Sequence, residues 1–497
     1  MEKKGKLELT WVGKYEDDEE LEPRILVEDK EKSYGDPNTE NMLIHGDNLL
    51  ALKALEKDYA GKIKSIYIDP PYNTGSAFEH YDDNVEHSIW LNLMKKRLEL
   101  LRVLLADDGF IFVQIDDNEM AYLKVLLDEV FGRTHYVNTI VWKRRGGSAN
   151  PKDRLNNITD FILWYSKTDE YKINPIFSKN DENTQKYIKE RFTNVDENGR
   201  RFMKSPLQSP NYRENLIYDY KGYKTPAKGY SISREVMEEW DKAGKLCFPK
   251  DKSQNINRKI YLDEYKGQPI GNLWTDISVI NPMAKERVDF DGGQKPEELI
   301  KRVLMLTTKP GDWVLDSFLG SGSTAATALK MNRKWIGIEL GEHAYTLVKP
   351  RLDGVIDGND EGGITESENW KGGSGYKFYE LAPALLVKNS KLPIYQINPE
   401  YTWDMVCEAI CKIEGFTYEP KDEFCGYSSE NRFIHVTKEL VNAKYVMTLA
   451  KSIGVNQSLL IYCQKYQSDM RLPANIEIKK IPKDLLAKCS FIKGEEA

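Results

Sequence analysis

No apolar stretch in this 497-residue sequence approaches the roughly twenty residues that a membrane-spanning helix requires. The first residues, MEKKGKLELTWVGKYEDDEE, also lack the apolar core of a secretion signal. We therefore expect a cytoplasmic protein with no membrane partner.

Cysteine is scarce, with six residues and no C-x-x-C pair. Cys407 and Cys411 are one helical turn apart, but no nearby histidine completes a set of metal ligands. A disulfide framework is not expected in the cytoplasm. The sequence therefore predicts no metal site and favours buried, reduced cysteines.

The net charge of −7 argues weakly against a polyanionic partner, but the charge is unevenly distributed. Residues 140–260 contain 25 lysines and arginines against 16 aspartates and glutamates. A basic segment within an acidic chain indicates a local surface for a polyanion such as nucleic acid. The alternative is a solvated basic loop region.

Apolar strands alternate with amphipathic helices in two separate parts of the chain, which is typical of a largely parallel α/β sheet. The stretch between them is polar, basic and without periodicity, as expected of an inserted domain. We expect one helix among the strands of the C-terminal part, over residues 438–453. The predicted segments are an N-terminal extension (1–40), the first half of the α/β domain (41–145), the insert (146–285), the second half (286–352), a glycine-rich linker with a return strand (353–385) and a small C-terminal α/β domain (386–497).

The stretch DSFLGSGST, residues 316–324, reads as a strand end, a glycine turn and a helix start. Gly320 and Gly322 allow a ligand to approach the backbone, and the helix start offers free N–H groups. The lysine of a P-loop and the third glycine of a dinucleotide fingerprint are both absent. Asp316 precedes the turn, and Glu339 ends the next strand, where a carboxylate can accept ribose hydroxyls. Carboxylates without a lysine suit the sulfonium cation of S-adenosylmethionine, although close helix–strand packing alone explains the glycines equally well.

A second motif, IDPPYNTG, begins at Ile68 and ends an apolar strand on a carboxylate. Two prolines present the Tyr72 ring rigidly, and stacking of a nucleobase on such a ring is worth ~1–3 kcal/mol. The Asp69 carboxylate and the Pro70 carbonyl can accept both protons of an exocyclic amine, which frees its lone pair for attack on a methyl cation. The alternative is a proline-rich turn with a capping aspartate.

D-P-P-Y followed about 250 residues later by DSFLGSGST resembles the beta class of amino DNA methyltransferases. Further segments, including LIHGDNLLALKALE, DDGFIFVQIDDNE, TDFILWYSK, QKPEELIKRVL and IGIEL, resemble the Mod subunits of type III restriction-modification systems. The resemblance covers roughly residues 8–382. It implies a Rossmann-like, mostly parallel methyltransferase sheet with helices on both faces, in which the insert is a target-recognition domain.

The resemblance also implies roles for individual positions. Asp47 is equally well explained as the N-cap of the following helix. The implied base-binding residues are Asp69, Pro70, Pro71 and Tyr72, and the implied cofactor-binding residues are Asp47, Lys295, Asp316, Phe318, Gly320, Gly322 and Glu339. The implied DNA-binding residues are Lys143, Arg144 and Arg145.

D-P-P-Y accompanies adenine N6 more often than cytosine N4 within this resemblance, so we expect adenine in double-stranded DNA as the target. No Pro-Cys dipeptide occurs, which leaves a covalent cysteine mechanism unsupported. Base flipping is implied, since the target amine lies inside the duplex. A separate restriction subunit and a homodimer are the implied partners. Cytosine-N4 transfer and a non-catalytic DNA-recognition subunit remain the alternatives.

Overall fold

The computed structural model forms two compact units by contacts between residues. One comprises Met1–Asn174 and Asn272–Ala497, and the other comprises Pro175–Gly271. The structure describes residues 8–15, 24–73, 87–144, 155–180, 182–290, 293–389, 391–428, 431–454 and 456–486. Within these ranges no helix is long and apolar enough to cross a membrane.

The first unit is built on a ten-stranded sheet with the order β1-β16-β2-β15-β14-β3-β4-β6-β5-β13. Neighbouring strands from β16 to β4 are parallel, whereas β1, and β6 between β4 and β5, pair antiparallel. The strands are β1 (Leu26–Gly35), β2 (Met42–His45), β3 (Ile63–Ile68), β4 (Leu105–Ile115), β5 (Tyr136–Lys143), β6 (Thr159–Ser166), β13 (Leu273–Trp274), β14 (Trp313–Asp316), β15 (Lys334–Glu339) and β16 (Gly375–Leu381).

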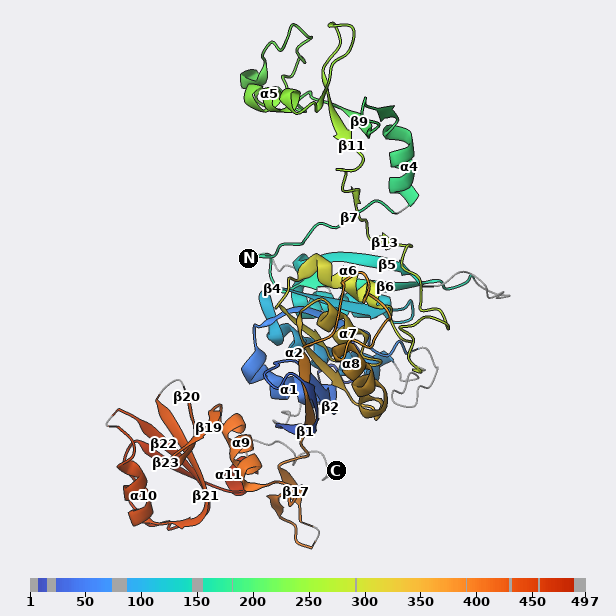
Figure 1. Cartoon of the computed structure of the whole chain (residues 1–497). Coiled ribbons are helices and arrows are strands. Elements are labelled where there is room, and N and C mark those ends of the chain that lie inside the picture. Colours follow the sequence, from blue (N-terminus) through green and yellow to red (C-terminus); the bar gives the residue numbers. More distant parts are fainter. Residues whose placement is uncertain are drawn as a thin grey trace. The chain divides into compact units, whose positions relative to one another are not determined.

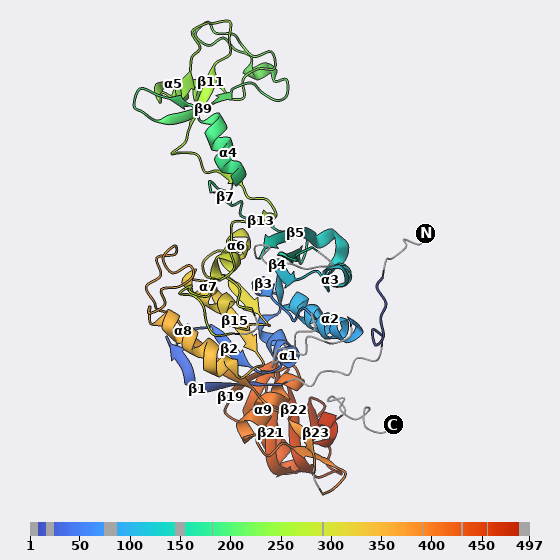
Figure 2. The ribbon, with the colours of Figure 1, turned by 90° about the vertical axis from the view of Figure 1, so that its right-hand side faces the viewer.

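Helices cover both faces of this sheet, as Figure 2 shows. One set lies on one face and the second set on the other, so the predicted α/β sheet with two helical layers is confirmed. The first set is α1 (Asn48–Tyr59), α2 (His87–Leu104) and α3 (Met120–Leu127), and the second is α6 (Glu297–Thr307), α7 (Ser323–Lys330) and α8 (Lys349–Ile356). Short irregular helical turns follow α3 (η1, Asp128–Gly132, and η2, Arg133–His135) and precede α8 (η4, Ala344–Val348).

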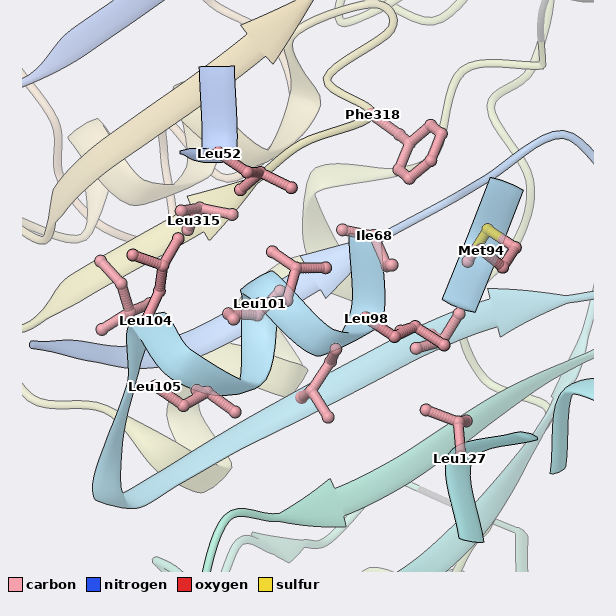
Figure 3. Close-up of a cluster of buried hydrophobic side chains, with 14 of the residues drawn as sticks. Leu52, Ile68, Met94, Leu98, Leu101, Leu104, Leu105, Leu127, Leu315 and Phe318 are labelled. Atoms are coloured by element: carbon pink, nitrogen blue, oxygen red, sulfur yellow. The ribbon is translucent and has the colours of Figure 1, made fainter. Parts of the chain in front are cut away.

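Helix α2 shows why the layers hold together. Its Met94, Leu98 and Leu101 recur at helical spacing, are fully buried and pack with Ile68 of β3 and Leu315 of β14 (Figure 3). Full burial of one such side chain contributes about 1.5–3 kcal/mol. The apolar stripe of α2 therefore covers the two strands whose ends carry the motifs.

Strand β1 lies within residues 1–40, where the sequence indicated only a polar extension. It pairs antiparallel with β16 at the edge of the sheet, from Leu26↔Leu381 to Gly35↔Gly375. Charged side chains are common on edge strands, where they discourage pairing with other chains. Because of these charges, the sequence of β1 lacks the apolar alternation that predicts a strand.

The second unit contains a four-stranded sheet, β10-β11-β9-β8, and a two-stranded sheet, β12-β7 (Figure 1). Two small apolar clusters, around Tyr230 and Phe192, stabilise it. Its elements are β7 (Phe177–Ser178), α4 (Glu182–Arg191), β8 (Asn194–Val195), β9 (Arg201–Pro206), η3 (Glu214–Leu216), α5 (Arg234–Lys242), β10 (Leu246–Cys247), β11 (Asn257–Tyr261) and β12 (Gln268–Pro269). Strand β6 falls inside the predicted insert, 146–285, yet belongs to the large sheet of the first unit.

The C-terminal part has a hairpin, β17 (Leu386–Lys388) and β18 (Tyr395–Ile397), and the sheet β19-β20-β21-β22-β23. Leu460 of β22 packs on the side of α9, and Ile461 on the side of α10, so these helices lie on opposite faces of the sheet (Figure 1). The elements are α9 (Trp403–Ile413), β19 (Thr417–Lys421), β20 (Phe424–Ser428), β21 (Arg432–Val441), α10 (Ala443–Ala450), β22 (Ser458–Tyr466), β23 (Ile476–Lys480) and α11 (Lys483–Leu486).

The single helix expected at residues 438–453 is wrong in two respects. Residues 438–441 belong to β21, because Leu440 and Val441 pair with β22. The helix starts only after Asn442, whose side chain accepts a hydrogen bond from the Tyr445 backbone N–H at 3.0 Å. Helix α9 was also missed.

Candidate active site

The two motifs lie at the same edge of the sheet because their strands are neighbours. β3 and β14 pair in parallel, with Ser65 opposite Val314 and Ile66 opposite Leu315. The loops that follow their carboxyl ends, residues 69–73 and 317–322, therefore meet at one edge, the usual place for a ligand site in an open α/β sheet. Burial raises the pKa of Asp316, and the negative charge of Asp69 adds to the rise, which is consistent with this proximity.

The D-P-P-Y loop is held by one internal hydrogen bond, one from α2 and an ion pair with the residue before Pro296. The Tyr72 hydroxyl donates to Asp69 Oδ1 at 2.7 Å. The Trp90 indole N–H of α2 donates to the Pro71 carbonyl at 2.8 Å. Asp69 Oδ2 pairs with the ammonium group of Lys295, whose Nζ also lies 5.3 Å from the centre of the Tyr72 ring. The loop thus presents a ring and a carboxylate in one fixed arrangement.

The partner of Lys295 was not anticipated. The sequence suggested that this lysine approaches the carboxylate of the cofactor, whereas the structure places it on the carboxylate of the D-P-P-Y motif. Lysine carries a compact point charge, and this charge lies on the Asp69 carboxylate.

Gly320 and Gly322 have φ angles of 54° and 79°, which side chains rarely adopt. A Cβ atom on Gly322 would lie 3.1 Å from Val348 Cγ1. The turn before them is organised by Asp316, which accepts hydrogen bonds from the Phe318 N–H at 2.9 Å and the Thr324 hydroxyl at 2.6 Å. The glycines therefore serve both backbone conformation and close packing.

Burial raises the pKa of Asp316 to about 7. Hydrogen bonds from Thr324 and Phe318 oppose this rise, and the charges of Asp69 and Glu339 add to it. A nearby cation would stabilise the ionised form of this buried carboxyl group, because a positive charge lowers its pKa.

Glu339, expected to bind ribose, supports the glycine turn directly. Its Oε2 accepts a hydrogen bond from the Gly320 N–H at 2.7 Å, and its Oε1 accepts one from the Gly341 N–H at 3.0 Å. Oε1 also lies 3.2 Å from Nε2 of His343, so neighbouring groups hold both oxygens of this carboxylate at the turn.

Asp47 is the N-cap of α1, with Oδ1 accepting a hydrogen bond from the Leu50 N–H at 3.1 Å. Its other oxygen lies 3.3 Å from an Arg97 guanidinium nitrogen. The neighbouring Asn48 donates to the Ser317 carbonyl at 2.7 Å, so this loop adjoins the glycine turn. Asp47 therefore caps α1 and also lies at the edge of the site.

Phe318 is 6% exposed and packs in the main hydrophobic core (Figure 3). Of the three basic residues, Lys143 is exposed at the end of β5. Arg144 faces inward, with Nε 3.2 Å from an oxygen of Asp160. Arg145 lies outside the described residues.

Two residues near the site were missed by the sequence analysis. Asp160 is fully buried on β6, and the Tyr72 hydroxyl lies 3.4 Å from its Oδ2. Phe290 lies against the glycine turn, since a Cβ on Gly320 would be 3.4 Å from its ring. An acid inside the apolar run TDFILWYS was the available signal for Asp160, whereas nothing in the sequence marked Phe290.

Comparison with known proteins gives consistent matches. The family model N6_N4_Mtase, described as DNA methylase, matches residues 63–350. A Haemophilus influenzae protein named "Probable type III restriction-modification enzyme HindVI Mod subunit" is 37% identical over 425 residues, covering 72% of this chain and 56% of the relative. The type II methyltransferase M.EcaI of Enterobacter cloacae is 33% identical, covering 63% of this chain and 69% of the relative. The chain thus spans little more than half the length of the Haemophilus relative.

Solved structures were compared as well. The Thermus thermophilus protein TTHA0409, crystallised in complex with S-adenosyl-L-methionine, is 15% identical with a TM-score of 0.37, covering 69% of this chain and all of that chain.

Proposed function

This chain belongs to the N6/N4 DNA methylase family, and from that premise we propose that it transfers a methyl group from S-adenosylmethionine to the N6 amino group of adenine in duplex DNA. One observation carries the proposal. The D-P-P-Y loop and the glycine turn follow adjacent parallel strands, so the Tyr72 ring and a carboxylate-rich turn meet at one sheet edge.

The residues of the turn fit a cationic cofactor. Asp316 is 2% exposed and carries no lysine or arginine partner among the contacts described for it. The Ser317 hydroxyl is buried without a hydrogen-bond partner in the described part of the chain, and a ligand can supply one. When bound, S-adenosylmethionine supplies an electrophilic methyl group on a sulfonium cation. The residues that would hold it are Asp47, Asp316, Phe318, Gly320, Gly322 and Glu339.

The D-P-P-Y residues would act on the target amine. The Tyr72 ring offers a stacking face, and the Asp69 carboxylate and the Pro70 carbonyl accept the amine protons. These acceptors free the nitrogen lone pair and stabilise the positive charge that develops on nitrogen. Lys295 forms an ion pair with Asp69 and orients its carboxylate, so the proposed role of the lysine moves from the cofactor to the motif.

DNA binding would depend on other parts of the chain. We assign target recognition to the predicted insert, 146–285, whose compact part is Pro175–Gly271. Lys143 is available for a phosphate contact because it is exposed at the end of β5. Base flipping would bring the adenine to Tyr72.

The Haemophilus relative is named as a Mod subunit, and we propose the same place for this chain. A separate restriction subunit and a homodimer remain predictions. Light scattering of the purified protein tests the dimer, and co-purification with a helicase-nuclease encoded nearby tests the restriction partner.

The enzymatic proposal is tested by incubating the protein with duplex DNA and methyl-labelled S-adenosylmethionine, followed by digestion and mass spectrometry of nucleosides. N6-methyl-2′-deoxyadenosine as the labelled product is the expected result. Labelled N4-methyl-2′-deoxycytidine alone would show that cytosine, and not adenine, is the target. Tight cofactor and DNA binding without any labelled nucleoside would support a non-catalytic recognition subunit.

A further inference from the structure

Asp160 is a second carboxylate beside the D-P-P-Y loop. It lies on β6 between the apolar residues of the large sheet and has no exposed surface. Its Oδ1 atom makes no hydrogen bond within the described residues, although Arg144 Nε lies 3.2 Å away. A buried carboxylate whose bonding capacity is only partly used is costly, which favours a functional reason for its presence.

The other oxygen of Asp160 connects two strands. Gln114 of β4 donates to Oδ2 at 3.0 Å, and the Tyr72 hydroxyl lies 3.4 Å from the same atom. Gln114 is itself fixed, because its Oε1 accepts a hydrogen bond from the Tyr67 hydroxyl. Asp160 therefore cannot move without disturbing a buried network.

Four charged side chains from different segments influence the carboxyl group of Asp160. Burial raises the pKa of its carboxyl group, and Asp69 adds to this, whereas Lys295 and Arg144 lower it. Asp116, directly after β4, carries a further carboxyl group whose pKa is raised by burial and also by the charge of Asp160. Placing an acid here opposes the stability of the fold, since a hydrophobic residue would pack without these costs.

The Tyr72 hydroxyl has one proton and two carboxylates within reach. It donates at 2.7 Å to Asp69 Oδ1 and stands 3.4 Å from Asp160 Oδ2. Lys295 already occupies the other oxygen of Asp69. An amine that needs an acceptor on Asp69 therefore competes with Tyr72 for Oδ1.

We infer that Asp160 is a positioning residue that takes over the Tyr72 hydroxyl when the target amine enters and so releases Asp69 Oδ1 to accept an amine proton. This inference rests on the proposed methyl transfer. When the Tyr72 hydroxyl switches its hydrogen bond from Asp69 to Asp160, it still has an acceptor. Without Asp160, this hydroxyl would keep its hydrogen bond to Asp69 Oδ1. Asp160 acts through Tyr72 and touches neither cofactor nor methyl group.

A double-mutant cycle tests the inference on the full-length protein, with Asp160→Asn and Tyr72→Phe alone and together. Asp160→Asn should lower kcat about tenfold, while the Kd of S-adenosylmethionine and the KM for DNA change less than twofold. In the Tyr72→Phe background the same substitution should change kcat less than twofold, because no hydroxyl remains to be moved. The matched control is Asp117→Asn, which removes a negative charge from an exposed position in the loop after β4. This variant should keep the wild-type kcat.

The outcomes separate the possible failures. An equal tenfold loss in both backgrounds, or an Asp160→Asn protein with wild-type kcat, would overturn the inference. A wild-type protein that labels no nucleoside would instead overturn the proposed function. If Asp160→Asn lowers the melting temperature and abolishes cofactor binding, Asp160→Glu replaces it in the cycle, because it keeps the charge and moves the oxygens. The loss of kcat caused by Asp160→Glu must likewise be absent when the substitution is made in the Tyr72→Phe protein.

Discussion

Lys295 and Asp69 form an ion pair across 226 positions of the chain. The lysine directly precedes Pro296, the N-cap of α6, and the aspartate directly follows β3. The pair therefore joins the two halves of the sheet domain at the place where the base would bind, and several expectations for the enzyme depend on it.

Removal of the D-P-P-Y carboxylate should abolish catalysis but not cofactor binding. Asp69→Ala takes away the acceptor for the amine proton, and loss of one such electrostatic contact costs about 10²–10³-fold in kcat. Calorimetry should give a Kd for S-adenosylmethionine close to that of the wild type, because Asp69 lies on the D-P-P-Y loop and not on the glycine turn. Asp58→Asn, on the exposed end of α1, is the control and should remain fully active. An active Asp69→Ala enzyme would remove Asp69 from the mechanism.

Replacement of Lys295 distinguishes its two possible partners. If it serves Asp69, Lys295→Met should reduce kcat by about 10–100-fold, since Asp69 loses its compensating charge. The Kd for S-adenosylmethionine should hardly change. A cofactor Kd raised in parallel with the loss of activity would instead restore the role suggested by the sequence. Stopped-flow or equilibrium fluorescence binding, combined with single-turnover methylation, gives both quantities.

Cofactor affinity should depend on pH through Asp316. Its pKa is raised to about 7, so the group is neutral below that pH and negative above it. The sulfonium cation prefers the negative form, and the apparent Kd should therefore increase about tenfold as the pH falls from 8 to 6. S-adenosylhomocysteine carries no sulfonium charge and should show a much weaker dependence. Calorimetric titrations of both ligands at several pH values test this, and identical profiles would exclude Asp316 as the responsible group.

Gly322 and Gly61 allow a matched test of the glycine turn. Both have a positive φ angle, 79° and 71°, but a Cβ atom meets Val348 only at Gly322 and open space at Gly61. Alanine at either position introduces backbone strain, on the order of 1 kcal/mol. Gly322→Ala should lower the free energy of unfolding further and weaken cofactor binding, whereas Gly61→Ala should leave binding intact. Chemical denaturation and calorimetry measure the two effects, and equal behaviour of the two variants would contradict the close packing described here.

The larger part of the architecture could be predicted from local patterns. The alternation of apolar strands and amphipathic helices, such as α2 with its buried Met94 and Leu98, indicated a largely parallel sheet, and the family resemblance implied helices on both faces. Strand β1 escaped prediction because an edge strand carries charges on the positions that would otherwise show an apolar period. The helix expected at 438–453 failed because pairing with β22 extends β21 into it.

The sequence alone determined which chemical groups this protein has and the order in which they occur: a ring and a carboxylate after one buried strand, and glycines between two carboxylates after another. Local periodicity and turn chemistry carry that information, since they depend on neighbouring residues. Only the tertiary structure decided that Lys295 pairs with Asp69, that Arg144 turns inward to Asp160, and that Asp160 lies within 3.4 Å of the Tyr72 hydroxyl. These pairings follow from the order of strands in the sheet, which brings together residues far apart in the chain and leaves no trace in the spacing of any one segment.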